Sequence, residues 1–232
     1  MNPTNNPSLL VIDTATEYCS AALLHDGATS SREQLAPRDH TKLILPFVHA
    51  LLQERSLKLQ DLDAIVFGQG PGSFTGVRIS IAAAQGLAFG ANLPLIGVSN
   101  LQAMAQQAYN EHACDRCLVA IDARMGEVYW GEYLSSDGLM QNLGEEKVIA
   151  PALIVGDASP GHYAGTGWQS YTAVLGERYT QALDSQVLYP KAESMISAAK
   201  AKWAKQDLLD PSTAEPVYLR NTVTWKKLPG RA

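Results

Sequence analysis

A glycine-rich connection at residues 68–76 constrains the fold more than any other stretch of the chain. A short apolar run, Ala64 to Phe67, predicts a buried strand, and glycines follow at positions 68, 70, 72 and 76 before a segment rich in small residues. Glycine allows positive φ angles and the close approach of a second backbone or of a phosphate. Ser73 or Thr75 is placed to cap the helix that we expect next. A strand, a tight loop and a helix in this order are typical of an α/β domain.

The same loop has two interpretations. Free N–H groups at a helix start suit an anion, so the loop can hold a nucleotide phosphate. It can equally be a structural elbow without a ligand. It contains no Lys for the Gly-x-x-x-x-Gly-Lys pattern, and in the dinucleotide pattern the third glycine comes one residue late, at Gly76. The dinucleotide pattern also expects an acidic residue about 20 residues further on, at the end of the next strand. Here that strand, Leu95 to Val98, is followed by Ser99.

The first strands of the chain offer a second candidate phosphate site. Leu9 to Ile12 reads as a buried strand, Tyr18 to Leu24 as a returning strand, and a hairpin turn leads to a third strand at Thr29 to Leu35. A strand that ends in Asp before a Thr-bearing turn is how actin-like ATPases hold Mg²⁺ and phosphate. In an ordinary β-meander the same side chains would only stabilise the turn. The candidates for a vestigial phosphate loop are Asp13, Thr14, Gly70, Gly72, Ser73 and Thr75.

Composition limits the class of protein. Hydrophobic residues make up 46% of the 232 positions and charged residues 18%, which predicts a globular chain with one large domain or two small ones. A net charge of −5 argues against a protein that binds nucleic acid without a partner. The three cysteines and the lack of a signal-like leader predict a cytoplasmic protein. No apolar run reaches the length of about 18 residues that a membrane helix needs.

Two helices are candidates for a docking face. Asp39 is placed to cap the first, whose apolar residues repeat at helical spacing around Pro46, where we expect a bend. The second helix carries small residues at intervals of four, and such a ridge lets another helix approach closely. The ridge packs either on the chain's own sheet or on another subunit. The predicted docking residues are Leu43, Phe47, Val48, Leu51, Gly76, Ser80 and Ala84.

The rest of the chain predicts alternating helices and strands, followed by a region of short strands and turns. A helix from Ser99 to about Asn110 and a strand from Cys117 to Ile121 continue the α/β pattern, which predicts a five-stranded mixed sheet with helices on its faces. Residues 127–165 read as short strands and turns. We expect a helix over residues 194–205 and a strand over residues 216–219.

Two remaining features carry weaker signals. Cys114 and Cys117 form a lone pair with no second pair to complete a zinc site, and the pair precedes a strand instead of opening a helix as a redox pair would. We therefore predict no metal site. The last residues, from Arg220 to Ala232, contain four basic and no acidic side chains. Such a tail contacts RNA or an acidic partner, or it is a solvated end.

The sequence resembles the TsaB (YeaZ) family along nearly its whole length. The segments that carry the resemblance are VIDTAT, RDHTKLILP, GQGPGSFTGVRIS, DARMGEVYW and PVYLRNTVTWKK, in this order. The resemblance implies an actin-like, Hsp70-like (ASKHA) fold of two subdomains, each with a mixed, five-stranded type of sheet flanked by helices. We expect a disordered tail at 1–7, an N-terminal subdomain at 8–110, a smaller C-terminal subdomain at 111–219 and a basic tail at 220–232.

The resemblance also implies a function. It predicts a non-catalytic subunit that binds and activates TsaD, a paralogue, together with the ATPase TsaE. TsaD transfers threonylcarbamoyl to the adenosine next to the anticodon of tRNA. This chain is therefore expected to contact tRNA only indirectly, through the complex. Alone, the chain is expected to cover its docking face as a homodimer. No cofactor is expected on the chain alone, and a nucleotide only in the complex.

The most informative positions are those at which this sequence departs from the catalytic paralogue TsaD. TsaD carries a His-x-x-x-His pair that binds its metal, and the matching positions here are Asn100 and Met104. An amide and a thioether do not replace two imidazoles at a hard, oxygen-rich metal site. The glycine-rich second phosphate segment of TsaD corresponds to Asp122–Met125, and no Gly-Gly pair occurs in the chain. These absences predict a catalytically degenerate scaffold with no catalytic residues.

Three other functions are open to the sequence. The first is an ATP-dependent phosphotransferase or hydrolase that acts alone through Asp13, Thr14 and the loop from Gly70 to Gly76. The second is a peptidase, for which Ser73 lacks both the Gly-x-Ser-x-Gly elbow and a nearby histidine. The third is a stand-alone RNA-binding module, against which the negative charge and the lack of an interleaved basic and aromatic patch both weigh.

Overall fold

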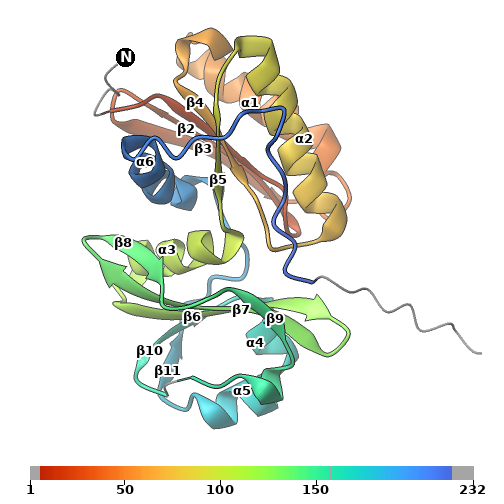
Figure 1. Ribbon diagram of the computed structural model, residues 1–232, viewed down its shortest axis with the longest axis vertical. Coiled ribbons are helices and arrows are strands. Elements are labelled where there is room, and N and C mark those ends of the chain that lie inside the picture. The colour runs from red at the N-terminus through yellow and green to blue at the C-terminus, as the bar shows by residue number, and fades with distance from the viewer. Residues whose placement is uncertain (1–5, 157, 221–232) are drawn as a thin grey trace, which may run out of the picture.

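The computed structural model describes residues 6–156 and 158–220 of the chain. Two mixed β-sheets follow one another along the long axis of the molecule, with helix α3 (Asn100–His112) between them (Figure 1). This arrangement confirms the predicted class, two sheets flanked by helices. No helix among the described residues combines the length and apolar character needed to cross a membrane.

The first sheet has the strand order β3-β2-β1-β4-β5. Strands β1, β2 and β3 form an antiparallel meander, while β1, β4 and β5 run parallel. Three of these strands are buried along their whole length, because helices cover both faces of the sheet, as is usual for parallel strands. The bounds are β1 (Leu9–Asp13), β2 (Tyr18–His25), β3 (Ala28–Leu35), β4 (Ala64–Gly68) and β5 (Leu95–Val98).

The two faces of this sheet have separate cores. Alternate residues of β1 point in opposite directions, so that Leu10 and Ile12 pack under α1 (His40–Glu54) and α2 (Phe74–Ala91). Leu9 and Val11 pack on the other face, against η3 (Ala192–Met195) and α6 (Ile196–Ala204). The helix predicted near residues 194–205 is therefore present, and it returns to the first sheet.

The second sheet has the order β11-β10-β6-β7-β8, with β9 paired to β7. It thus has one strand more than the expected five. Helix α3 covers one face, and two short helices that sequence reasoning missed cover the other. The bounds are β6 (Arg116–Arg124), β7 (Glu127–Ser136), β8 (Leu139–Asn142), β9 (Lys147–Ile149), β10 (Gly161–Ala164), β11 (Ala182–Asp184), α4 (Thr166–Ser170) and α5 (Thr172–Arg178). Two further 3₁₀ turns are η1 (Leu59–Asp61) and η2 (Pro151–Leu153).

Two local predictions are wrong. The side chain of Asp39 does not cap α1 but binds Lys42, with 2.6 Å between Oδ1 and Nζ. Residues 216–219 are not a strand, because a single backbone hydrogen bond, from Val217 N to Gln69 O, ties them to the sheet region. Elsewhere the predicted strands and helices are present, with β6 and α3 extending a few residues beyond their predicted ends.

The C-terminal segment connects the two halves of the molecule. After α6, Leu209 pairs with Leu95 at the edge of the first sheet, and the chain then descends toward the second sheet (Figure 1). The expected subdomain boundaries stay a prediction. Of the two expected tails, residues 1–5 and 221–232 lie outside the described part, and Pro7 is buried.

Candidate functional site

The glycine elbow at the start of α2 packs tightly on the turn after β1. Ser73 caps the helix, since its Oγ accepts a hydrogen bond from Gly76 N at 3.0 Å. A Cβ atom on Gly76 would lie 2.1 Å from Thr14 O, and one on Gly72 would lie 2.4 Å from Ala15 O. These two positions therefore require glycine because another backbone approaches them.

Hydrogen bonds fix the same contact. Thr14 Oγ1 donates to Gly76 O at 2.7 Å, and Ser73 N donates to Ala15 O at 2.7 Å. Three polar groups of the elbow, the Thr14 hydroxyl and the backbone N–H groups of Ser73 and Gly76, are therefore used within the chain. Thr75, by contrast, is exposed and makes none of these contacts. The local geometry fits the structural elbow.

Asp13 lies beneath this elbow, fully buried. Asn100 Nδ2 donates to Asp13 Oδ1 at 2.7 Å, and Asn100 Oδ1 accepts from Gly70 N at 2.8 Å, so the Asn100 amide ties β1 to the glycine loop. Burial raises the pKa of Asp13 from its ordinary value of 3.8 to about 7, although the hydrogen bond from Asn100 works in the opposite direction. The second carboxylate oxygen, Oδ2, has no hydrogen-bond partner.

A cleft of about 480 Å³ opens beside the elbow, between the loops of the two sheets. Of the six predicted phosphate-loop residues, Gly72 and Ser73 line it, whereas the other four do not. Asp13 is shut off from the cleft by the turn that follows it, whose residues Ala15, Thr16 and Glu17 form the near wall. The structure therefore separates the predicted set into three parts: Asp13, Thr14 and Gly70 are buried, Gly72 and Ser73 line the cleft, and Thr75 is exposed outside it.

The far wall of the cleft is the hairpin between β6 and β7. It holds Asp122–Met125, the stretch that the resemblance aligns with the glycine-rich phosphate segment of TsaD. Arg124 and Met125 take positive φ angles of 63° and 59° there. Arg124 N donates to Asp122 Oδ1 at 2.9 Å, and the Arg124 guanidinium lies 3.2 Å from Asp122 Oδ2 and 3.9 Å from Glu17 Oε1. Side chains and their ion pairs occupy the position where a glycine-rich loop would leave space.

The C-terminal segment closes one end of the cleft, which sequence reasoning missed. Arg220 Nη2 donates to Glu127 Oε2 at 2.6 Å and to Arg124 O at 3.4 Å. Just before it, Tyr218 Oη accepts from Arg78 Nε at 2.9 Å, and the Arg78 guanidinium lies 3.5 Å from the centre of the Phe74 ring. The sequence marked Arg220 only as the start of a basic tail, and its position beside β7 could not be read from spacing.

The predicted docking residues are mostly not at the surface, which corrects that list. Val48, Leu51, Gly76, Ser80 and Ala84 are buried in the first core. The Ser80 hydroxyl donates to Ile12 O at 3.3 Å, so the predicted ridge packs on the chain's own sheet. Only two of the seven residues, Leu43 and Phe47, are half-exposed.

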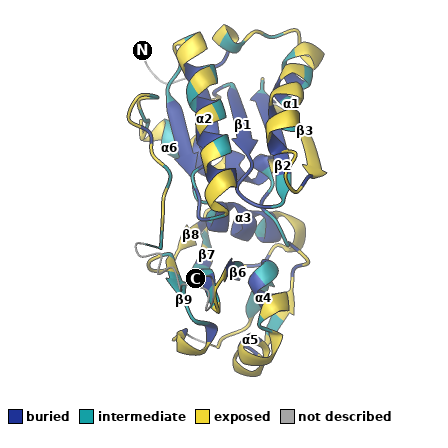
Figure 2. Cartoon of the chain, turned by 90° about the vertical axis from the view of Figure 1, so that its right-hand side faces the viewer, coloured by how far each residue is buried: buried dark blue, intermediate teal, exposed yellow. Residues whose placement is uncertain are grey.

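A different ridge of small residues faces outward on α2. Ala82, Gly86 and Gly90 follow one another at intervals of four and are all exposed, and nothing lies within 4 Å of a Cβ built on either glycine. Figure 2 shows the exposed stripe of α2 beside that of α1. Phe89 and Leu45 add apolar surface, with 61% and 51% of their areas exposed.

The cysteine pair lies away from both regions. Cys114 and Cys117 are buried free thiols at the junction of α3 and β6. Their mutual hydrogen bond lowers the pKa of Cys114 and raises that of Cys117. Within residues 6–156 and 158–220, no group of three or more potential His, Cys, Asp or Glu ligands is placed to hold a metal ion.

Comparison with known proteins identifies the family. Residues 30–219 match the family model of TsaD, tRNA N6-adenosine threonylcarbamoyltransferase. The tRNA threonylcarbamoyladenosine biosynthesis protein TsaB of Escherichia coli is 46% identical over 96% of this chain and 99% of its own length, and its Haemophilus influenzae counterpart is 41% identical over 97% and 99%.

Solved structures agree with this match. YeaZ from Pseudomonas aeruginosa is 45% identical and superposes with a TM-score of 0.85, covering 92% of this chain and all of that one. The agreement confirms the actin-like fold expected from the sequence. The elbow, the paired loops and the two sheets thus belong to a known architecture, and the chain is a member of the TsaB (YeaZ) family, which falls within the wider family described by TsaD.

Proposed function

We propose that this protein is a non-catalytic subunit in the formation of threonylcarbamoyladenosine in tRNA. Its relatives carry the name of tRNA threonylcarbamoyladenosine biosynthesis proteins, and its own chain matches the model of the transferase TsaD. In this proposal it binds and activates TsaD together with TsaE. It meets tRNA only within that complex.

The observation that carries the non-catalytic role is the placement of Asn100 and Met104. These residues stand where the resemblance places the two metal-binding histidines of TsaD. The Asn100 amide is engaged on both sides, with Asp13 and Gly70, and Met104 is fully buried in the core beside the second sheet. Neither side chain is placed to hold a catalytic metal.

We assign partner binding to the outward faces of α1 and α2. The exposed ridge of Ala82, Gly86 and Gly90 allows a second helix to approach closely, because the distance between helix axes depends on the side chains at the contact. Exposed Leu45 and Phe89 supply apolar area to bury. The same face would hold TsaD in the complex and a second copy of this chain in its absence.

Calorimetric titration of Mg-ATP tests this function against an independent ATPase. With the purified chain alone we expect no heat of binding, and with TsaD present we expect binding or turnover to appear. Micromolar binding by the chain alone, with ATP hydrolysis that survives removal of TsaD, would establish the phosphotransferase or hydrolase alternative and overturn the proposal. Asp13→Asn is the matched variant, because it would abolish such an activity.

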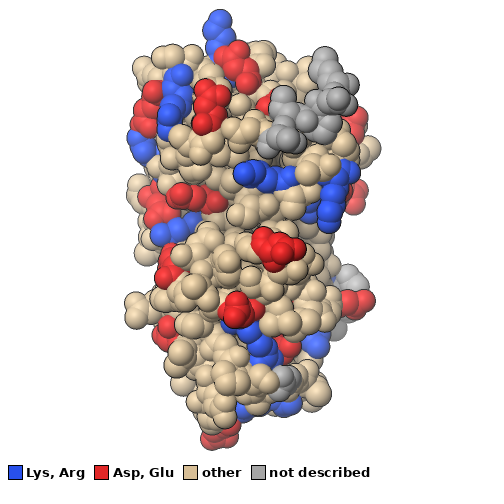
Figure 3. Space-filling model, turned by 90° about the vertical axis from the view of Figure 1, so that its left-hand side faces the viewer, with Lys and Arg blue, Asp and Glu red and all other residues tan. Residues whose placement is uncertain are grey.

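Charge distribution supports indirect contact with tRNA. On the face shown in Figure 3, acidic and basic side chains are interspersed, without a continuous basic surface. A protein that binds RNA alone usually presents such a surface. The contribution of residues 221–232, which hold three of the four basic residues of the tail, is testable by truncation after Arg220.

A further inference from the structure

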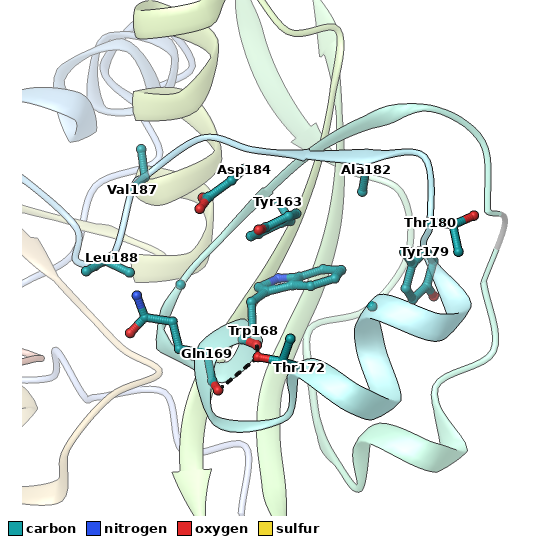
Figure 4. Close-up of a pocket in the computed structure, with 12 residues that line it drawn as sticks. Tyr163, Trp168, Gln169, Thr172, Tyr179, Thr180, Ala182, Asp184, Val187 and Leu188 are labelled. Carbon is teal, nitrogen blue, oxygen red and sulfur yellow. Dashed lines mark hydrogen bonds between the residues drawn. The ribbon is translucent and has the colours of Figure 1, made fainter.

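The second half of the molecule contains a cavity that the proposed function does not use. It has a volume of about 260 Å³ and lies between α5 and the edge strands β10 and β11, on the sheet face opposite α3. Figure 4 shows Tyr163 and Trp168 one above the other, Tyr179 at one end of the cavity and Asp184 beside Tyr163.

Aromatic rings form the inner wall. The centres of the Tyr163 and Trp168 rings are 4.4 Å apart at an interplanar angle of 23°, and Tyr179 meets Trp168 edge-on at 5.8 Å. Trp168 Nε1 donates to Leu118 O at 3.2 Å, so the polar atom of the indole is satisfied by the sheet. The remaining ring surface is an apolar, electron-rich wall.

The polar groups of the cavity favour a positively charged ligand. Asp184 is the only ionisable acid or base of the Asp, Glu, Lys, Arg or His type among the lining residues, and it is exposed at the rim. The hydroxyl of Thr172 already donates to Trp168 O at 2.8 Å and to Gln169 O at 3.1 Å. The cavity therefore offers aromatic rings and a carboxylate, of which Oδ1 already accepts a hydrogen bond from Gln186 N at 2.8 Å. Rings and a negative charge together attract organic cations.

Gly176 lies on the exposed rim of the cavity. It lies in the interior of α5 and lines the cavity, and nothing lies within 4 Å of a Cβ built on it. Nearby Gly165 and Gly167 are different, because a Cβ on either would collide with Ala120 O, at 2.2 and 2.8 Å. A helix-interior glycine costs about 1 kcal/mol relative to alanine. Packing within the chain gives no reason for glycine at position 176, so alanine there would narrow the mouth of the cavity without a clash.

We propose that this cavity binds a small organic cation, an alkylammonium or alkylguanidinium group, against Trp168, Tyr163 and Tyr179 with Asp184 as the counter-charge. Such a group fits the aromatic wall by cation–π attraction and the rim by charge. It can come from a free amine or from a Lys or Arg side chain of another protein, and both sources share this chemistry.

Nuclear magnetic resonance of the full chain tests the proposal. n-Butylammonium and n-butylguanidinium are titrated while the indole N–H signal of Trp168, assigned with Trp168→Phe, is followed. We expect a saturable shift at millimolar concentration and no shift with the neutral probe n-butanol. Asp184→Asn should weaken binding at least tenfold. Gly176→Ala should weaken it similarly while raising Tm, which separates loss of space from loss of fold.

The control is Gly144→Ala, an exposed glycine with nothing within 4 Å of its built Cβ and outside the cavity. This variant should bind as the unaltered chain does. Equal binding of n-butanol, or unchanged binding by Gly176→Ala, would overturn the proposal. A second titration with the peptide Gly-Arg-Gly amide separates the sources: tighter binding than free n-butylguanidinium supports a protein side chain, and weaker binding supports a free amine.

Discussion

At the scale of single residues, Asp13 is enclosed by the core and does not face the cleft. A carboxylate that faces a metal or phosphate stays accessible, whereas Asp13 is fully buried under the elbow and bound by Asn100. Its burial raises its pKa to about 7. The residue type could be read from the sequence, but not its enclosure, because that depends on Asn100 and Gly70 arriving from other elements.

This burial predicts a pH dependence of stability. The pKa of Asp13 is higher in the folded state than its ordinary value of 3.8, so the folded state binds the proton more tightly. The free energy of unfolding should therefore fall as pH rises above about 4 and through the folded-state pKa of about 7. Between pH 5 and pH 8 the fall should be on the order of 3 kcal/mol. Urea unfolding across this range measures the fall.

Asp13→Asn should remove most of this fall and stabilise the protein at pH 8, because the amide oxygen still accepts from Asn100 and carries no charge. The control is Asp137→Asn, an exposed turn residue at a φ of 51° that asparagine tolerates. A pH profile of Asp13→Asn that matches the parent would show that Asp13 does not titrate in this range.

At the scale of elements, helix α2 carries two interleaved rows of small residues with the same spacing. Gly76, Ser80 and Ala84 face the sheet, whereas Ala82, Gly86 and Gly90 face outward. The two rows predict opposite effects of one substitution. Gly76→Ala should destabilise by about 2–4 kcal/mol, since its Cβ would lie 2.1 Å from a backbone oxygen.

Gly86→Ala should instead stabilise by up to about 1 kcal/mol, because the position is open and alanine is the better helix former. Urea unfolding of both variants at one pH gives the comparison. Equal destabilisation by the two alanines would contradict the assigned orientation of α2.

These rows also show what the sequence can and cannot predict. Apolar runs and glycine positions were sufficient for β1 to β5, the elbow, and helices α1 to α3, because those signals are local. The orientation of α2 is not local, since it follows from the contact of Gly76 with Thr14. The short helices α4 and α5 were missed because seven residues or fewer give too little periodicity to recognise.

At the scale of the whole molecule, the C-terminal segment links the two sheets through Arg220 and Glu127. Arg220→Ala should cost at most about 1 kcal/mol of global stability, because an ion pair near the surface contributes little. It should nevertheless speed hydrogen exchange of Val217 N–H, which donates to Gln69 O at 2.8 Å. Arg55→Ala, at an arginine that contacts Ser30, is the control and should leave that amide protected. Unchanged exchange in Arg220→Ala would mean that the segment is held without this pair.

The proposed docking face predicts an assembly defect. Ala82→Arg should leave the fold intact, because the position is exposed on a helix, but should shift the chain to monomer in sedimentation and prevent its co-purification with TsaD. Ala173→Arg, an exposed helical alanine on α5, is the matched control and should behave like the parent chain. A dimer that persists in Ala82→Arg would move the interface away from α2.

The most direct measurement is the formation of threonylcarbamoyladenosine on tRNA in a mixture of TsaD, TsaE, the threonylcarbamoyl donor and this protein. The account predicts that the Ala82→Arg variant abolishes product formation. The Asp13→Asn variant should support product formation as well as the parent chain does, because Asp13 is buried and touches no reactant. The opposite result, full activity with Ala82→Arg and none with Asp13→Asn at equal fold stability, would contradict the account and place chemistry in this chain.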